Sequence, residues 1–374
     1  VAIITATISA AHSKEVTIPL TITGTSTIES DYSTAFSSKG YSTVAGGNDQ
    51  GSSNNQLYQP SGIFLDSNMN LYIADKGNYR IMKWAPGATE GIVVAGANGE
   101  GSEFNQFSNQ SPYDIYVDSS QNIYVSDFNN HRVMKWAPGA TEGIIVAGGN
   151  GFGSANNQLN KPTGISVDSS GNMYISDYSN HRVMKWVSGG SEGSVVAGGN
   201  GEGNGLEKVE YPWGNAVDSA GNLYVAESDL YGNHRVTKWA PGATSGTIVA
   251  GGNNAGSAAN QLNTPHGIFL DSSGNLYISD YRNARIQKWS PGSNEGVTVA
   301  GGNGEGSSAD QMQYHKGLFV DSFSNIYISD YNNNRIQKRT VNPEITIPAG
   351  SITGTITFTG IDDSTDEAGE TIIV

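Results

Sequence analysis

Residues 162–186 read PTGISVDSSGNMYISDYSNHRVMKW, and close variants of this stretch recur along the chain. Its Val/Leu-Asp-Ser segment stands at six places, Asp66, Asp118, Asp168, Asp218, Asp271 and Asp321. The successive spacings are 52, 50, 50, 53 and 50 residues. A period near fifty residues with several strands in each unit indicates a β-propeller or a related array.

Each repeat supplies four short strands. In the unit that begins at residue 162, segments rich in Val, Ile and Tyr are separated by Gly, Ser and Asn turns, which favours strands. The four segments are residues 164–168, 173–177, 182–186 and 195–197. Four antiparallel strands with tight turns make one propeller blade, so six repeats predict six blades.

The phase of the repeat predicts how the ring closes. A Val-Ala-Gly strand occurs at residues 44–46, ahead of the first inner strand, whereas the sixth unit ends at Arg339 without such a strand. We therefore expect residues 42–45 to pair with residues 335–339 and complete the sixth blade. This pairing leaves no open edge inside the ring.

The two ends of the chain lack the repeat. Residues 15–24 and 344–358 are Thr/Ile/Val-rich and alternate with a period of two, which is typical of sandwich strands. Because ring closure brings the two ends together, we predict one domain interrupted by the ring. The predicted fold is all-β, with a six-bladed propeller at residues 39–341 inserted into an immunoglobulin-like β-sandwich made of residues 1–38 and 342–374.

Composition excludes several kinds of partner. The chain has 374 residues and a formal charge of −15, and no Lys/Arg cluster is present that could neutralise phosphates, so nucleic acid is not an expected partner. The absence of Cys removes disulfides and thiolate metal sites. No run approaches the ~20 apolar residues of a membrane span. The first residues contain no leader, so we expect a mature or excised piece.

The repeat unit resembles the NHL repeat of secreted bacterial proteins. The resemblance rests on Pro-x-Gly-Ile, Val-Asp-Ser-Ser-Gly-Asn, Tyr-Ile-Ser-Asp and Asn-x-Arg-Ile/Val, and it covers about four fifths of the chain. It implies a six-bladed propeller in an extracellular, cell-surface protein of a bacterium. NHL propellers include a zinc-dependent amidating lyase, and related six-bladed folds include calcium lactonases.

The flanks resemble the two halves of a Calx-beta domain, through residues 24–33 and through the TIPAG and IDD segments near residues 346–350 and 361–363. The resemblance implies Ca²⁺ as a cofactor, with ligands at Asp31, Asp362 and Asp363, because Ca²⁺ requires hard oxygen donors. The alternative is a solvated acidic loop. The sequence departs from the family pattern in having no strand before residue 1 and in ending its last strand at Val374.

Repetition separates structural residues from candidate functional ones. A charge pair that fixes a blade turn is needed in every blade, so six acid–Arg pairs indicate structure. The pairs are Asp75/Arg80, Asp127/Arg132, Asp177/Arg182, Glu227/Arg235, Asp280/Arg285 and Asp330/Arg335. The repeated Tyr and Trp positions likewise predict packing between blades.

Function is expected where the repeats differ. The repeat position that lies between Pro and Gly in the Pro-x-Gly-Ile segment is occupied in the six units by Ser61, Tyr113, Thr163, Trp213, His266 and Lys316. Such positions crowd round one mouth of the central channel. We therefore predict a glycan or small-molecule site made by Tyr113, Trp213, His266 and Lys316. The alternative is sequence drift at a half-exposed turn.

The histidines argue against a zinc enzyme. His131, His181 and His234 share one Asn-His-Arg repeat position and are interpreted as scaffold, which leaves His266 and His315 near the mouth. Two histidines without a companion acid make a poor zinc site. The expectation is therefore that the chain is not an enzyme, with a metal-dependent lyase or lactonase as an alternative.

The resemblance also predicts assembly. A sandwich without its first strand, and with its last strand cut short, exposes an edge that recruits a partner. The candidate donor strands are marked by Val1, Ile3, Ile4, Ile8, Ile372 and Val374. We predict an extracellular structural subunit that joins copies of itself head-to-tail into a filament by strand addition. The alternative is a carbohydrate-binding adhesive module that uses the channel mouth.

Overall fold

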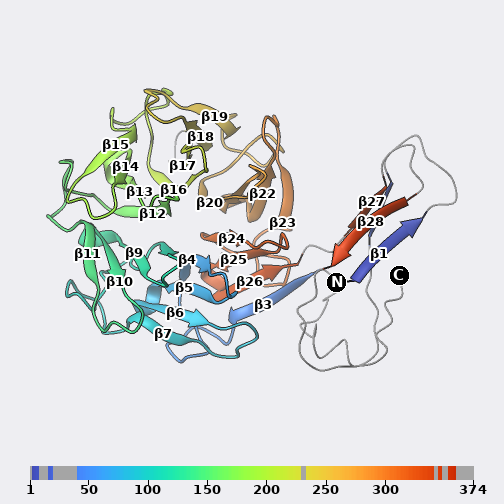
Figure 1. Cartoon of the computed structure of the whole chain (residues 1–374), viewed down its shortest axis with the longest axis horizontal. Helices are drawn as coiled ribbons and strands as arrows, with labels where there is room; N and C mark the ends of the chain where they lie inside the picture. The colour runs from blue at the N-terminus through green and yellow to red at the C-terminus, as the bar shows by residue number, and fades with distance from the viewer. Residues whose placement is uncertain are drawn as a thin grey trace. The chain divides into compact units, whose positions relative to one another are not determined.

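The computed structural model describes residues 2–7, 16–19, 40–228, 233–340, 344–347 and 353–358. Contacts divide the chain into two units (Figure 1). One comprises Val1–Ser42 together with Thr340–Val374, and the other comprises Thr43–Arg339. Each unit is described by itself below.

The larger unit is a six-bladed β-propeller, which confirms the predicted ring. Six four-stranded antiparallel sheets are arranged radially round a central axis (Figure 1). The first three blades are β4 (Pro60–Leu65), β5 (Leu71–Asp75), β6 (Arg80–Trp84), β7 (Ile92–Gly96); β8 (Ile115–Val117), β9 (Ile123–Asp127), β10 (Arg132–Trp136), β11 (Ile144–Gly148); and β12 (Pro162–Val167), β13 (Met173–Asp177), β14 (Arg182–Trp186), β15 (Gly193–Gly198). The others are β16 (Pro212–Val217), β17 (Leu223–Glu227), β18 (Arg235–Trp239), β19 (Thr247–Gly251); β20 (Pro265–Leu270), β21 (Leu276–Asp280), β22 (Arg285–Trp289), β23 (Val297–Gly301); and β24 (Leu318–Val320), β25 (Ile326–Asp330), β26 (Arg335–Arg339), β3 (Tyr41–Gly46).

The sixth blade closes the ring in the predicted way. Its sheet has the strand order β24, β25, β26, β3, so the outermost strand comes from the N-terminal side of the propeller. The Gly47 amide donates to the Asn334 carbonyl at 3.0 Å and extends this junction. The ring is therefore held shut by hydrogen bonds between segments that are almost 300 residues apart in sequence.

The Asp-Ser-Ser-Gly-Asn segment forms the turn between the first two strands of a blade. In the third blade, Oδ1 of Asp168 accepts hydrogen bonds from the backbone amides of Ser170 and Asn172, at 3.0 and 2.9 Å. The Asn172 side chain donates to Oδ2 of Asp168 at 2.9 Å. Such side-chain acceptors stabilise tight turns, and the arrangement recurs in the other five blades.

The core lies between blades. One buried cluster contains Tyr72 and Ala74 of the first blade together with Ile115, Val125 and Trp136 of the second. All five of the repeated tryptophans are at most 4% exposed, which confirms their predicted packing role. Because each blade buries its apolar face against the next, the ring is a cooperative unit of neighbouring blades.

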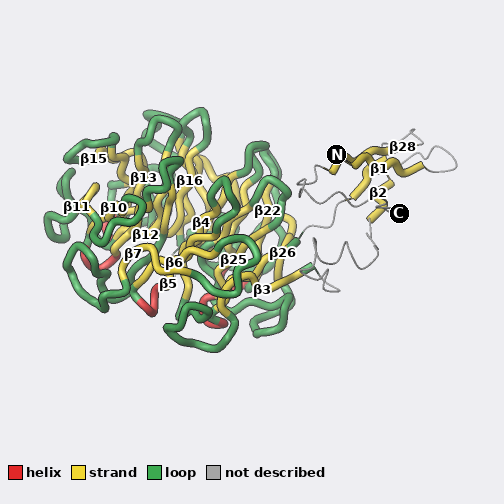
Figure 2. Tube along the Cα trace, turned by 60° about the horizontal axis from the view of Figure 1, so that its bottom comes forward, coloured by secondary structure: helices red, strands yellow, loops and turns green. Residues whose placement is uncertain are grey.

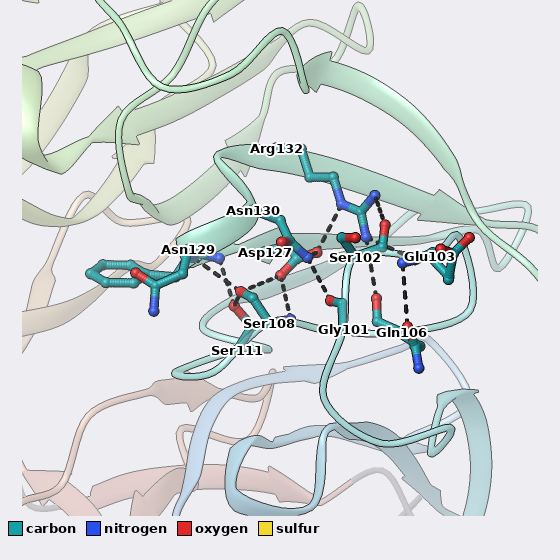
Figure 3. Close-up of polar contacts among 11 residues, drawn as sticks. Gly101, Ser102, Glu103, Gln106, Ser108, Ser111, Asp127, Asn129, Asn130 and Arg132 are labelled. Atoms are coloured by element: carbon teal, nitrogen blue, oxygen red, sulfur yellow. Dashed lines mark hydrogen bonds and ion pairs between the residues drawn. The ribbon is translucent and has the colours of Figure 1, made fainter.

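A polar network joins the second and third strands of each blade to the loop that enters the blade. Figure 3 shows this network in the second blade. The Arg132 guanidinium contacts the Asp127 carboxylate at 2.8 Å and donates to the Ser102 carbonyl at 2.8 Å. Asn130 donates to Asp127 at 2.8 Å. The other five acid–Arg pairs lie at 2.7–3.1 Å, which confirms their structural role. We call this set, Asp127, Asn130, Arg132 and their counterparts, the hub network.

Helical structure in the described residues is confined to three-residue 3-10 turns, seen as the short red segments in Figure 2. These turns are η1 (Lys76–Asn78), η2 (Phe128–Asn130), η3 (Tyr178–Asn180), η4 (Tyr281–Asn283) and η5 (Tyr331–Asn333). None of them is long or apolar enough to cross a bilayer.

The smaller unit contains strands from both ends of the chain. Antiparallel pairing joins β1 (Ala2–Thr7) to β28 (Thr353–Phe358), and β2 (Val16–Pro19) to β27 (Glu344–Ile347). The immunoglobulin-like sandwich and the Calx-beta resemblance stay predictions. The candidate calcium ligands Asp31, Asp362 and Asp363 lie outside the described residues, as do Val1, Ile8, Ile372 and Val374.

Candidate functional site at the channel mouth

A bulge brings the variable residue of four inner strands to the axis, whereas Tyr113 and Lys316 lie two residues before β8 and β24. In β12, Pro162 pairs with Asp177 and Ile165 pairs with Ile175, so two residues, Thr163 and Gly164, stand opposite one. The same shift occurs in β4, β16 and β20. A bulge bends a strand and re-aims its side chains, which explains why a position inside a buried strand can serve a site.

The glycine after the variable residue is required by close contact between blades. A Cβ on Gly267 would lie 2.4 Å from the Lys316 carbonyl oxygen, and a Cβ on Gly317 would lie 2.5 Å from that of Ser61. Only glycine fits such an approach. Consecutive blades therefore meet backbone to backbone round the axis, and their variable side chains are forced into one ring.

This ring encloses a central cavity of about 40 Å³. Its side-chain lining is Ser61, Tyr113, Asp114, Trp213, His266 and Lys316. The structure thus brings together the four predicted site residues. Thr163 is fully buried and donates to the Pro212 carbonyl at 2.8 Å, so it serves the packing of neighbouring blades.

The aromatic members of the ring stack on one another. The Trp213 ring lies 5.9 Å from Tyr113 and 4.3 Å from His266, with interplanar angles of 22° and 16°. His266 stacks in turn on Tyr281 at 4.3 Å. Trp213 therefore stacks on two other rings, and the cavity beside them is on the scale of water molecules. A glycan site at Tyr113 and Trp213 stays a prediction that needs these rings to separate.

Three polar atoms of the ring are buried without a hydrogen-bond partner among the described residues: the Tyr113 hydroxyl, Nε1 of Trp213 and Nδ1 of His266. An unsatisfied buried polar atom costs about 1–3 kcal/mol. Burial lowers the pKa of His266 well below its usual value, and the neighbouring Lys316 acts in the same direction. The imidazole is therefore neutral at neutral pH.

Two lysines converge on the same pair of tyrosine rings. Nζ of Lys316 lies 4.1 Å from the ring centre of Tyr331 and 5.2 Å from that of Tyr113. Nζ of Lys76 lies 5.4 Å from each of these rings. Within the described part of the chain, no carboxylate lies within 4.0 Å of either nitrogen. We call Lys76 and Lys316 the lysine pair.

The surroundings of the lysine pair favour the neutral amine. Burial lowers the pKa of Lys76 to about 8. Burial also lowers the pKa of Lys316 well below its usual value, and the positive charge of Lys76 adds to this effect. A desolvated ammonium group beside a second cation readily loses its proton. Each amine of the pair therefore loses its proton more readily than the amine of an exposed lysine.

Sequence reasoning missed two residues of the site, and a departure from the repeat marks each of them. Lys76 opens the turn η1, where four of the other blades have Phe128, Tyr178, Tyr281 or Tyr331. Asp114 stands where the other blades have glycine, and its carboxylate accepts the Ile165 amide at 2.9 Å. Burial raises the pKa of Asp114 to about 6. Comparing every repeat position, and not only the one between Pro and Gly, would have found both.

A second cavity adjoins the lysine pair. It has a volume of about 160 Å³ and is lined by Lys76 and Tyr331 together with Tyr58, Gln59, Tyr79, Asn109 and Gln110. The Lys76 ammonium donates to Oε1 of Gln110 at 3.4 Å. Lys76 and Tyr331 therefore border a space large enough for a molecule of several heavy atoms, and this space has amide groups along its wall.

The remaining histidines serve the scaffold or lie away from the cavity. Nδ1 of His131 accepts the Lys161 amide of the next blade at 3.1 Å, and His181 and His234 accept equivalent amides. His315 is fully buried, and its Nε2 lies 2.9 Å from the Arg285 carbonyl oxygen. No group of three or more His, Asp or Glu side chains in the described ranges could hold a metal ion.

Comparison with protein families identifies the repeat. Residues 109–136, 159–186 and 262–289 match the NHL repeat. The chain carries NHL repeats. These three segments fall in the second, third and fifth blades, and each ends with the third strand of its blade. No curated protein matches the sequence.

Solved structures share the fold of this NHL propeller at low sequence identity. A gluconolactonase from Xanthomonas campestris is 13% identical, with a TM-score of 0.58, and the match covers 89% of this chain and 98% of that one. An auxiliary nutrient binding protein from Bacteroides thetaiotaomicron is 13% identical, with a TM-score of 0.58 and coverages of 80% and 75%. A protein of unknown function from the same bacterium is 16% identical, with a TM-score of 0.58 and coverages of 80% and 74%. At these identities the likeness shows the fold alone.

The prediction that the chain is not an enzyme is wrong. A gluconolactonase has this propeller fold over nearly its whole length, so the fold gives no ground for excluding catalysis. The prediction considered repeated charge pairs and zinc-type histidines, and it did not consider the amine groups of the non-repeated lysines Lys76 and Lys316 at this mouth. A repeated scaffold can hold a functional side chain that occurs only once, wherever one blade departs in sequence from the others.

Proposed function

We propose that the NHL propeller binds a small organic anion at its channel mouth. The observation that carries the proposal is the lysine pair: two amine side chains share the faces of Tyr113 and Tyr331, and no carboxylate in the described residues pairs with them. Two like charges in a desolvated site repel, and an anion between them converts that repulsion into attraction.

The adjoining cavity supports a ligand the size of a small carboxylate. Its volume of about 160 Å³ lies beside Lys76, and the amides of Gln59 and Gln110 add neutral hydrogen-bonding groups. The chain as a whole carries a charge of −15, which opposes the approach of any anion. Recognition therefore depends on short-range contact with the lysine pair, and we expect it to weaken as salt increases.

Titration calorimetry with lactate as the probe at pH 7 and low salt tests the proposal. Lys76→Met keeps most of the apolar stem and removes the charge, so we expect affinity to fall about tenfold or more, which corresponds to about 1.4 kcal/mol. The matched control is Lys185→Met, because Lys185 also lies over a tyrosine ring but belongs to a repeated position paired with Asp168. Equal affinities for Lys76→Met and the unaltered protein would overturn the proposal.

We also propose a second role, in which the chain is an extracellular subunit that assembles by β-strand addition. The observation that favours it is the pairing of the smaller unit: β1 pairs with β28 in a two-stranded sheet, and each has one strand neighbour among the described residues. Unpaired strand edges recruit further strands. The pairing of Ala2–Thr7 within its own chain means that donation to a neighbouring copy would require an exchange or an added strand.

Deleting residues 1–8 tests assembly. The truncated protein should keep the propeller, as judged by circular dichroism, and should lose the ability to form filaments in electron micrographs. Filaments of normal length from the truncated protein would overturn strand donation by this segment.

The calcium site implied by the Calx-beta resemblance belongs to the same proposal. Ca²⁺ at Asp31, Asp362 and Asp363 should stabilise the folded state by mass action, by about 2.7 kcal/mol at a hundredfold excess over Kd. The melting temperature should rise accordingly. A thermal scan that responds neither to EDTA nor to millimolar Ca²⁺ would overturn it.

A further inference from the structure

The amines of the mouth differ from the repeated lysines that lie over tyrosine rings. Six lysines repeat, one in the third strand of each blade, at 5.0–5.4 Å from a tyrosine ring: Lys83, Lys135, Lys185, Lys238, Lys288 and Lys338. Repetition marks these lysines as structural. Lys76 and Lys316 occur once each and lie over the same two tyrosine rings.

This arrangement favours a nucleophilic amine. A lysine becomes reactive when its ammonium form is disfavoured by desolvation and by a second cation nearby. Lys316 has both features, because two tyrosine rings cover it and Lys76 approaches the same rings. A hydrogen-bonding interaction between the two side chains raises the pKa of Lys76 and lowers that of Lys316. Of the two amines, that of Lys316 is therefore the one placed to act as the nucleophile, and Lys76 is the neighbouring cation.

We infer that Lys316 captures a 2-oxo acid as an imine, while Lys76 holds the carboxylate of the same molecule. A 2-oxo acid carries a ketone carbon directly beside a carboxylate, which matches an amine and an ammonium group that share the same two rings. This inference deepens the proposed function and rests on it, because it assigns a ligand class to the same site.

The covalent step balances without any co-reactant. The Lys316 nitrogen attacks the ketone carbon, a C–N bond forms, and the carbonyl π electrons move to oxygen, which takes a proton from nitrogen. The carbinolamine then expels this oxygen as water, and the remaining N–H proton leaves with it. The products are one imine and one water molecule, and nothing is oxidised or reduced.

The mouth supplies the conditions that such an adduct needs. The stacked rings of Tyr113, Trp213 and His266 exclude bulk water from one side, which slows hydrolysis of the imine. The side cavity bordered by Lys76 and Tyr331 gives a small ligand a way to approach. Asp114 also lines the central cavity, and its buried carboxylate is held by the Ile165 amide.

Reductive trapping tests the inference on the full-length protein. The protein is treated with pyruvate and sodium borohydride at pH 7, and peptides are mapped by mass spectrometry. We expect a carboxyethyl group on Lys316, at a level about tenfold or more above that on Lys185 in the same molecules. Tyr174 and, to a smaller extent, Asp168 raise the pKa of Lys185, and each unit of pKa difference changes the amine fraction tenfold.

Variants distinguish a nucleophilic role of Lys316 from a purely structural one. Lys316→Arg retains a cation and removes the nucleophile, so the adduct should disappear, whereas Lys185→Arg should leave it unchanged. Lys76→Met removes the neighbouring charge, raises the pKa of Lys316 and should shift the pH profile of trapping to higher pH. The titratable or charged groups that face Lys316 are Lys76, Tyr113, Asp114, His266 and Tyr331.

The outcomes separate the two proposals. If lactate binds and pyruvate leaves no adduct on Lys316, imine capture is wrong and the anion site stands. If neither lactate binding nor an adduct is found, both are wrong. If the adduct spreads evenly over Lys316 and the repeated lysines, the labelling is nonspecific and imine capture is likewise wrong.

Discussion

The hub network and the channel mouth are built on the same six repeats and use them in opposite ways. In the hub, an acid, an arginine and the entering loop meet in every blade with ion-pair distances of 2.7–3.1 Å. At the mouth, each blade contributes a different side chain to one cavity. Side chains that repeat in every blade therefore stabilise the ring, whereas side chains that occur once are available to bind a ligand.

The two regions also differ in whether their positively charged side chains are paired with an acid. The hub neutralises its buried cations: Arg182 is paired with Asp177 and also donates to the Ser154 carbonyl. The mouth leaves Lys76 and Lys316 without an acid partner in the part of the chain that the structure describes. Natural proteins rarely keep unpaired charges at such sites for stability, which supports the proposal that the mouth binds an anion.

The largest expected effect is the loss of one hub pair. Asp177→Asn leaves the buried Arg182 without a counter-charge, and breaking a buried pair costs about 3–5 kcal/mol. Urea unfolding followed by tryptophan fluorescence measures this loss. If Asp177→Asn is no less stable than the unaltered protein, the hub network does not stabilise the ring in the way described.

A smaller effect comes from the histidines that link blades. His131 and His181 accept backbone amides through Nδ1, and burial lowers the pKa of each. The unfolded state therefore binds protons first as the pH falls, so stability present above pH ~6.5 is lost as the pH drops towards the folded-state pKa values. We expect the urea midpoint to decrease between pH 7 and pH 5.5.

Asparagine at these positions sharpens the test, because Asn334 accepts the Gln59 amide at 2.9 Å in the same way. His131→Asn combined with His181→Asn should reduce the pH dependence while preserving the hydrogen bonds. His266 and His315 have lowered pKa values too, so the dependence is reduced and not abolished. An unchanged pH dependence in the double variant would show that these histidines are not responsible.

The smallest expected effect is on the stability of the ring when mouth residues are returned to the repeat pattern. Lys76→Tyr and Asp114→Gly each replace a charged group by the residue type found in other blades. Removing a buried, poorly paired charge should leave the free energy of unfolding unchanged or raise it by about 0.5–2 kcal/mol. Lactate binding should nevertheless be lost in Lys76→Tyr. A stability loss as large as that of Asp177→Asn would mean that the mouth is structural after all.

The sequence could predict the ring because its information is repeated. The sequence contains six repeat units with a period near fifty residues, and each unit has an Asp-Ser turn and an acid–Arg pair. The structural role of these features is therefore clear even where one copy deviates. The phase of the Val-Ala-Gly strand also predicted the closing of blade six, and β3 lies beside β26 as expected. The ring of variable residues was likewise predictable, since a fixed repeat position must lie at a fixed radius.

What the sequence by itself determined is therefore the propeller, its closure, and the convergence of Tyr113, Trp213, His266 and Lys316 on one axis. Only the tertiary structure decided that Trp213 stacks on both Tyr113 and His266, and that Lys76 joins Lys316 over Tyr113 and Tyr331. Lys76 comes from the turn between the second and third strands of the first blade, and Lys316 lies just before the inner strand of the sixth blade, 240 residues later. Their meeting depends on ring closure, which places the first and sixth blades side by side. The reactivity of an amine depends on what surrounds it, and those neighbours are set by packing across blades and not by any local sequence pattern.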